Sequence, residues 1–135
     1  MTTRQLFIVT ALSEVGLGLL LVSVPSMPVL LLIGASLDTP GALVVARVAG
    51  AALLSIGAAC WLARDDGQSR AAKGLVAALL LYNAVVVALV LSASFGSLGA
   101  LLFALAVLHG AMAMWCIWLL RGLRMARGAH DGKSA

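Results

Sequence analysis

The sequence predicts an all-α integral membrane protein: a four-helix bundle with one short re-entrant or interfacial segment between its first two spans. Three observations carry this prediction. Hydrophobic residues make up 63% of the 135 residues and charged residues only 10%, against about 25% charged residues in ordinary soluble domains. Four apolar stretches each approach the roughly 20 residues that a helix needs to cross a bilayer. The cations gather at the ends of these stretches. Because a chain this short has little surface on which to keep such a composition in water, residues 1–135 are expected to form a single membrane domain.

The boundaries of the predicted spans follow from prolines and from hydrophilic connections. Pro25 ends the first span, because proline does not continue a helix without losing a hydrogen bond. The hydrophilic stretch 64–73 separates the second span from the third, and a tight turn at 93–97 separates the third from the fourth. A polar cytoplasmic tail is expected over 121–135. The four predicted helices cover residues 6–24, 41–63, 74–92 and 98–120.

The connection between the first two spans is unusual. Residues 29–37 read VLLLIGASL, and Pro25, Pro28 and Pro40 bracket them. This segment is apolar but too short to cross a bilayer. It is therefore either a re-entrant segment that lies over one end of the bundle or a short helix that rests on the membrane surface. The sequence leaves both alternatives open.

The distribution of Lys and Arg predicts the orientation in the membrane. The first and third connections contain neither residue type, and their only charge is Asp38. Because short cytoplasmic loops carry the excess of cations, we expect both termini to face the cytoplasm of a bacterial inner membrane. Cations at span ends indicate orientation, so no nucleic-acid partner is expected. The cations outside the spans are Arg4, Arg64, Arg70, Lys73, Arg121, Arg124, Arg127 and Lys133.

Each predicted span carries one conspicuous polar residue: Glu14, Arg47, Asn83 and His109. Ionisable groups at membrane depth usually face the bundle interior and pair with one another. We therefore expect a buried polar cluster in which Glu14 and Arg47 form an ion pair, with hydrogen bonds from the other two residues. The alternatives are an Arg47 side chain that extends to the membrane surface and a Glu14 that carries a proton.

Secondary candidates for the site are Tyr82, Trp115 and Cys116. Cys116 lies seven positions after His109, which is about 10 Å along a helix and too far for the two to share a metal ion. Cys60 is the other cysteine, and both are expected to be free thiols. We expect no metal site and no catalytic residue, and the sequence leaves the cofactor open.

The arrangement resembles the small DoxX-like bacterial membrane proteins. The resemblance rests on four spans in a short chain, a glycine-containing first helix with an early acidic residue, and the second-helix sequence Arg47-Val-Ala-Gly50 followed by Gly57. It covers the topology and the first two helices. Because that group includes proteins linked to quinone-coupled redox complexes, the resemblance implies a quinone as one possible partner.

These observations favour a non-enzymatic role over an enzymatic one. The sequence offers no Ser-His-Asp set, no pair of carboxylates at membrane depth and no phosphate-binding loop. The expected function is an accessory or scaffold subunit, or a binder of a lipid-like or quinone-like molecule. One alternative is a small transporter or proton-relay protein that uses Glu14 and His109, and another is a subunit of a membrane redox complex. Expected partners are the lipid bilayer and a homo-oligomer or larger membrane complex.

Overall fold

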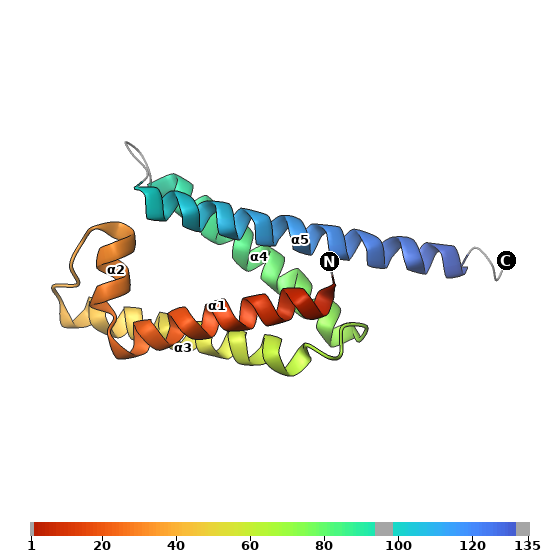
Figure 1. Cartoon of the computed structure of the whole chain (residues 1–135), viewed down its shortest axis with the longest axis horizontal. Coiled ribbons are helices and arrows are strands. Elements are labelled where there is room, and N and C mark those ends of the chain that lie inside the picture. The colour runs from red at the N-terminus through yellow and green to blue at the C-terminus, as the bar shows by residue number, and fades with distance from the viewer. Residues whose placement is uncertain (1, 94–98, 132–135) are drawn as a thin grey trace.

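The computed structural model describes residues 2–93 and 99–131, and these residues form five α-helices and no strand (Figure 1). Four of the described helices are long and apolar enough to cross a membrane, with spans Thr3–Ser23, Pro40–Ala63, Arg70–Ser92 and Ala100–Gly122. The prediction of an all-α chain with four long apolar helices is thus confirmed. The helices are α1 (Thr3–Ser23), α2 (Ser26–Ile33), α3 (Pro40–Ala63), α4 (Arg70–Ala93) and α5 (Ala100–Asp131).

Side chains of the residues just before α1 and α3 fix where these helices begin. The Thr2 hydroxyl accepts a hydrogen bond from the Gln5 amide at 3.2 Å, and the Gln5 side chain accepts one from the Thr2 amide at 2.9 Å. This reciprocal pair satisfies two amides at the start of α1. Thr39 accepts from the Ala42 amide at 3.2 Å, and Pro40 then occupies the first turn of α3, where its missing N–H costs nothing.

Several helix boundaries differ from the prediction. The short helix α2 covers Ser26–Ile33 instead of 29–37, and it ends at Gly34, whose φ of 72° suits a residue without Cβ. α4 begins four residues early because the Ser69 hydroxyl accepts from the Ala72 amide at 3.0 Å. α5 continues to Asp131. The fall in hydropathy after Leu120 marks the end of the apolar span but not of the helix, because the following Arg, Leu, Met and Ala residues are good helix formers.

Part of the predicted organisation lies outside the described residues. This applies to the tight turn at 93–97, apart from Ala93, to Leu98 at the predicted start of the fourth span, and to residues 132–135 of the predicted tail.

The long helices associate as two pairs. α1 packs along α3 in the lower part of Figure 1, and α4 packs along α5 above and behind them. The α1–α3 contact is made by main chains: a Cβ on Gly18 would lie 2.8 Å from the Gly50 carbonyl oxygen, and a Cβ on Gly57 would lie 3.1 Å from that of Ala11. Small residues at such contacts let the backbones of membrane helices approach closely.

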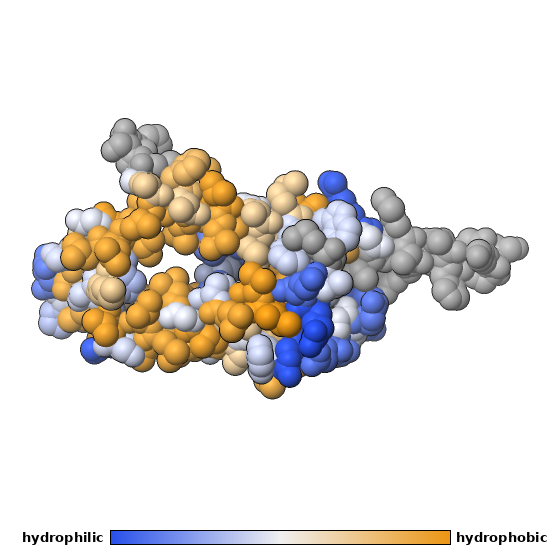
Figure 2. Space-filling view, viewed as in Figure 1, coloured by the Kyte–Doolittle hydropathy of each residue, from blue (hydrophilic) through white to orange (hydrophobic). Residues whose placement is uncertain are grey.

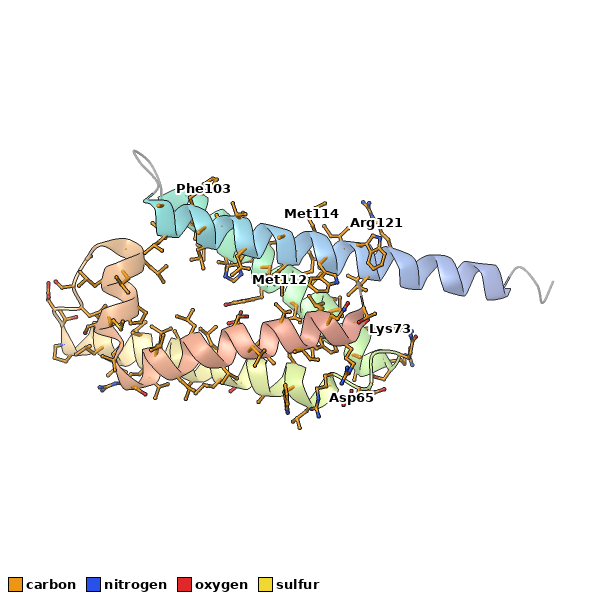
Figure 3. All side chains as sticks on the ribbon, in the orientation of Figure 1. Asp65, Lys73, Phe103, Met112, Met114 and Arg121 are labelled. Carbon is orange, nitrogen blue, oxygen red and sulfur yellow. The ribbon has the colours of Figure 1, made fainter. Side chains whose placement is uncertain are left out.

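The two pairs pack against each other at one end. The buried hydrophobic core there draws residues from α1, α3, α4 and α5. The same end carries charge: Arg4 Nε lies 2.9 Å from Asp65 Oδ1, and Figure 3 shows Asp65, Lys73 and Arg121 gathered there. The core residues are Leu6, Phe7, Ala11, Cys60, Ala72, Val76, Leu79, Met112, Cys116 and Leu119.

The pairs separate toward the other end. No residue of 84–92 in α4 or of 99–108 in α5 is buried. Figure 2 shows an opening between the hydrophobic surfaces of the two pairs, and α2 contacts both α1 and α5 beside it. The fold therefore encloses a cleft that the core closes at one end and α2 bridges at the other.

Candidate binding site at the base of the cleft

A cavity of about 200 Å³ lies where the two helix pairs begin to separate. α1, α4 and α5 contribute its walls, which are mainly aliphatic, and its polar groups come from all three helices. Figure 3 shows Met112 on the side of α5 that faces α1, and Phe103, which is 58% exposed, on the outer side. The lining residues are Val9, Thr10, Ser13, Glu14, Leu17, Asn83, Leu105, Leu108, His109 and Met112.

Glu14 is the acidic residue of the cavity and is only 6% exposed. It lines the cavity together with Asn83 of α4 and His109 of α5, so its side chain is directed toward that helix pair. The Tyr82 hydroxyl donates a hydrogen bond to Glu14 Oε2 at 3.3 Å. A carboxyl group away from water requires such partners, and Tyr82 supplies one from the opposite helix pair.

Asn83 and His109 form the second half of the polar cluster. Asn83 Nδ2 donates to the Leu79 carbonyl oxygen at 2.7 Å, and Asn83 Oδ1 lies 2.8 Å from His109 Nδ1. A main-chain carbonyl only accepts hydrogen bonds, so the amide nitrogen belongs on the Leu79 side and the amide oxygen on the His109 side. Asn83 is 3% exposed and His109 is 8% exposed. This pair links α4 to α5 inside the packed region.

Tyr82 connects the two halves of the cluster. Its hydroxyl binds Glu14, and the edge of its ring meets the His109 ring, with centroids 5.7 Å apart and planes at 79°. Edge-to-face contacts of this kind are favourable for aromatic rings. The sequence marks Tyr82 only as a secondary candidate, whereas the structure places it between Glu14 and His109. Glu14, Tyr82, Asn83 and His109 are called the polar cluster below.

Arg47 does not join the polar cluster, which corrects the predicted ion pair with Glu14. Its side chain is exposed on α3, and the salt bridges within the described ranges involve Arg4, Arg64 and Asp65. The reason is the register of the α1–α3 pair. Because Gly18 meets Gly50 in an antiparallel pair, Arg47 lies about two turns, or roughly 10 Å, from the level of Glu14.

The remaining secondary candidates lie outside the cavity. Cys116 is fully buried in the hydrophobic core together with Cys60, and both are free thiols. Trp115 packs against this core, and its indole Nε1 is buried without a hydrogen-bond partner. Neither Trp115 nor Cys116 lines the cavity.

Residues that sequence reasoning did not place in the site are Thr10, Ser13 and the apolar wall. Thr10 lies one turn before Glu14, so helical spacing gave a usable signal for it. Its Oγ1 is buried without a partner, while the Ser13 hydroxyl donates to the main-chain oxygens of Val9 and Thr10. The aliphatic wall residues carry no distinguishing sequence signal, because most of the chain is aliphatic.

The described residues bring no three His, Cys, Asp or Glu side chains close enough to hold a metal ion. The cavity can instead hold a small polar group among hydrogen-bonding side chains, with aliphatic surface around it. No family model, curated protein or solved structure matches this chain. The resemblance to DoxX-like proteins accordingly stays a prediction.

Proposed function

We propose that this chain binds a lipid-soluble molecule with a hydrogen-bonding head group, of the quinone class, in the cleft between α1 and the α4–α5 pair. The observation that carries this proposal is the polar cluster at the base of a mainly aliphatic cavity. Ligand sites typically combine apolar walls with a few convergent polar groups. A quinone has a matching division into an apolar tail and a ring that bears two oxygens.

The size of the cavity supports a partly enclosed ligand. Its volume of about 200 Å³ is below the ~300–1,000 Å³ of sites that enclose a whole drug-sized molecule. We infer that a head-group ring occupies the cavity and that the tail leaves through the opening beside α2 (Figure 2). The tail then lies against the unburied faces of 84–92 and 99–108. Lipid tails and the ligand tail are both apolar, so either can pack against these faces.

We infer a non-enzymatic role for the chain: it binds the ligand as an accessory subunit of a membrane complex, such as a redox complex, or as a homo-oligomer. The polar cluster has one carboxyl group and one imidazole, which position and hydrogen-bond a ligand without supplying an electron acceptor.

A proton relay is the second function that a specific observation favours. Tyr82 donates a hydrogen bond to Glu14 and meets the His109 ring edge to face, so these three side chains lie side by side between the two helix pairs. The two functions differ in a measurable property, because only the relay carries protons across a membrane. Purified protein in acid-pulsed liposomes should therefore show a proton flux that Glu14→Gln abolishes if the relay is correct, and no flux above empty liposomes if the chain only binds.

The inferred location is a bacterial inner membrane with both termini in the cytoplasm. This rests on the charged end formed by Arg4, Asp65, Lys73 and Arg121 (Figure 3), because cytoplasmic ends of membrane proteins are rich in cations. α2 would then cover the outer end of the cleft, as an interfacial or re-entrant helix. Alkaline phosphatase fused after Asp38 should be active, and the same enzyme fused after Gln68 should be inactive. The reverse pattern would contradict this orientation.

Ligand binding itself can be tested with 2-decyl-1,4-benzoquinone and the corresponding hydroquinone. Protein in lipid nanodiscs should bind at least one of them, measured by calorimetry. His109→Phe should weaken that binding about tenfold or more, because a lost buried hydrogen bond leaves its partner unsatisfied. Ser55→Ala is the matched control, since the Ser55 hydroxyl bonds only the Ala51 carbonyl on an exposed face of α3. Absence of binding, or equal affinities for wild type and His109→Phe, would refute the proposal.

A further inference from the structure

The orientation of the Asn83 amide fixes which nitrogen of His109 carries a hydrogen. Asn83 Nδ2 is held by the Leu79 carbonyl oxygen at 2.7 Å, so Oδ1 is the atom that lies 2.8 Å from His109 Nδ1. An amide oxygen has no hydrogen to give, and therefore Nδ1 must be the donor of this bond. In a neutral imidazole the other nitrogen, Nε2, is then a hydrogen-bond acceptor.

Nε2 is also the polar atom that His109 has left for a ligand. The ring lines the cavity, Nδ1 is turned to Asn83, and no partner of Nε2 occurs within 2–93 and 99–131. The ring is 8% exposed, and no carboxylate of these residues lies within salt-bridge distance of it. A buried ring without an opposite charge in contact is more stable when neutral, which leaves the Nε2 lone pair available.

The hydroxyl hydrogen of Tyr82 is committed as well. It is directed to Glu14 Oε2 at 3.3 Å, so the ligand does not receive it. A ligand head group that brings only acceptors would leave the lone pair of Nε2 facing it without a hydrogen. A head group that brings a hydroxyl would complete the bond.

We propose that the cleft selects a head group that donates a hydrogen bond to His109 Nε2, so that a quinol binds more tightly than the corresponding quinone. This rests on the proposed function and adds the redox state of the ligand. A quinone presents two carbonyl acceptors, whereas a quinol presents two hydroxyl donors. Leaving a buried acceptor unsatisfied typically changes affinity by about tenfold or more. Because the reduced form is bound more tightly, a tenfold preference raises the two-electron potential of the bound couple by about 30 mV.

The direct test compares three probes on the full chain in nanodiscs without oxygen. They are 2-decyl-1,4-hydroquinone, 2-decyl-1,4-benzoquinone and the dimethyl ether of the hydroquinone, which keeps the ring and tail but has no donor. We expect the hydroquinone to bind about tenfold more tightly than either of the others. Equal or tighter binding of the benzoquinone would overturn this inference and leave the proposed function standing. Failure of all three probes to bind would overturn both.

Substitution of Asn83 provides a second test of the proposal. In Asn83→Leu the imidazole loses the acceptor that holds its hydrogen on Nδ1, so Nε2–H becomes available as a donor to a carbonyl. The preference for the hydroquinone should fall toward equality, mainly because the benzoquinone binds better. Ser55→Ala is the matched control outside the cleft: it removes a hydroxyl that bonds the Ala51 carbonyl at an exposed position of α3, and it should keep the wild-type preference. An unchanged preference in Asn83→Leu would contradict the assigned tautomer.

A spectroscopic measurement tests the tautomer without any ligand or any change in the polar cluster. The chain contains two histidines, and His130→Gln leaves His109 as the only one. Nitrogen-15 NMR of ring-labelled protein should show a protonated Nδ1 and an unprotonated Nε2. A hydrogen on Nε2 alone, or on both nitrogens at the pH of the binding assay, would overturn the inference even if the Asn83 variant fails to fold.

Discussion

Gly18 of α1 lies against Gly50 of α3 so closely that a Cβ on Gly18 would come within 2.8 Å of the Gly50 carbonyl oxygen. This contact sets the register of the α1–α3 pair. The pair places Gly57 beside Ala11 and Val15, near the level of Glu14, and Arg47 beyond Gly50, toward α2. The absence of any side chain at these two positions thus decides which polar residues of the two helices can meet.

The close approach of α1 and α3 at Gly18 predicts how the protein responds to a methyl group added at that position. Gly18→Ala should destabilise the protein by about 1–3 kcal/mol, because the main chains must move apart to admit the Cβ. Gly16→Ala is the matched control, since a Cβ there meets nothing within 4 Å, and alanine is intrinsically favoured over glycine in a helix. Thermal unfolding in detergent, followed by circular dichroism, checks this. If both substitutions changed the stability equally, the main chains of α1 and α3 would not be in close contact at Gly18.

Because Glu14 and Arg47 lie apart, the effects of substituting them on the free energy of unfolding should be additive. The free-energy changes of Glu14→Gln and Arg47→Met should sum to that of the double variant within about 0.5 kcal/mol, as for sites without shared partners. Arg47→Met alone should have little effect because the side chain is exposed. Unfolding of the wild type, both single variants and the double variant measures this. If the double variant were more stable than Glu14→Gln alone, that result would contradict the separation and support an ion pair between Glu14 and Arg47.

The Asn83–His109 bond predicts a stability cost of its own. Asn83→Leu should destabilise the protein by about 1–3 kcal/mol, because His109 Nδ1 stays buried without a hydrogen-bond partner in either tautomer of the ring. Ser92→Ala removes a side-chain bond to the main chain at an exposed position of α4, so it should cost well under 1 kcal/mol. Chemical unfolding of both variants provides the comparison. A cost for Asn83→Leu no larger than that of the control would mean that the bond contributes nothing.

The two thiols are predicted to be unreactive in the folded protein. Cys60 and Cys116 are both free and 0% exposed in the core. A water-soluble maleimide should therefore label neither until the protein unfolds. Each Cys→Ser change should cost more stability than the matching Cys→Ala change, because a hydroxyl in apolar surroundings needs a partner. Rapid labelling of either thiol in native protein would contradict the packing of the core.

The polar cluster shows which features of the site helical spacing in the sequence can predict and which it cannot. Glu14, Asn83 and His109 were expected to be buried because polar groups at membrane depth avoid lipid, and the structure buries all three. Spacing along a single helix could not show that Tyr82 lies between Glu14 and His109, since these residues belong to three helices. It also could not show that Arg47 is excluded, because that depends on how α1 slides along α3.

The sequence alone determined that the chain is all-α, that four helices are long and apolar enough to cross a membrane, and that the Pro25–Pro40 segment is too short to do so. These properties follow from local hydropathy and from proline geometry, which act within one segment at a time. The tertiary structure alone decided that the helices associate as two pairs, that the pairs diverge beyond Asn83 and His109, and that α2 bridges the opening. In a chain whose residues are mostly aliphatic, any helix face can pack in lipid or in protein with similar free energy. Small differences in shape, such as Gly18 against Gly50, therefore select the arrangement.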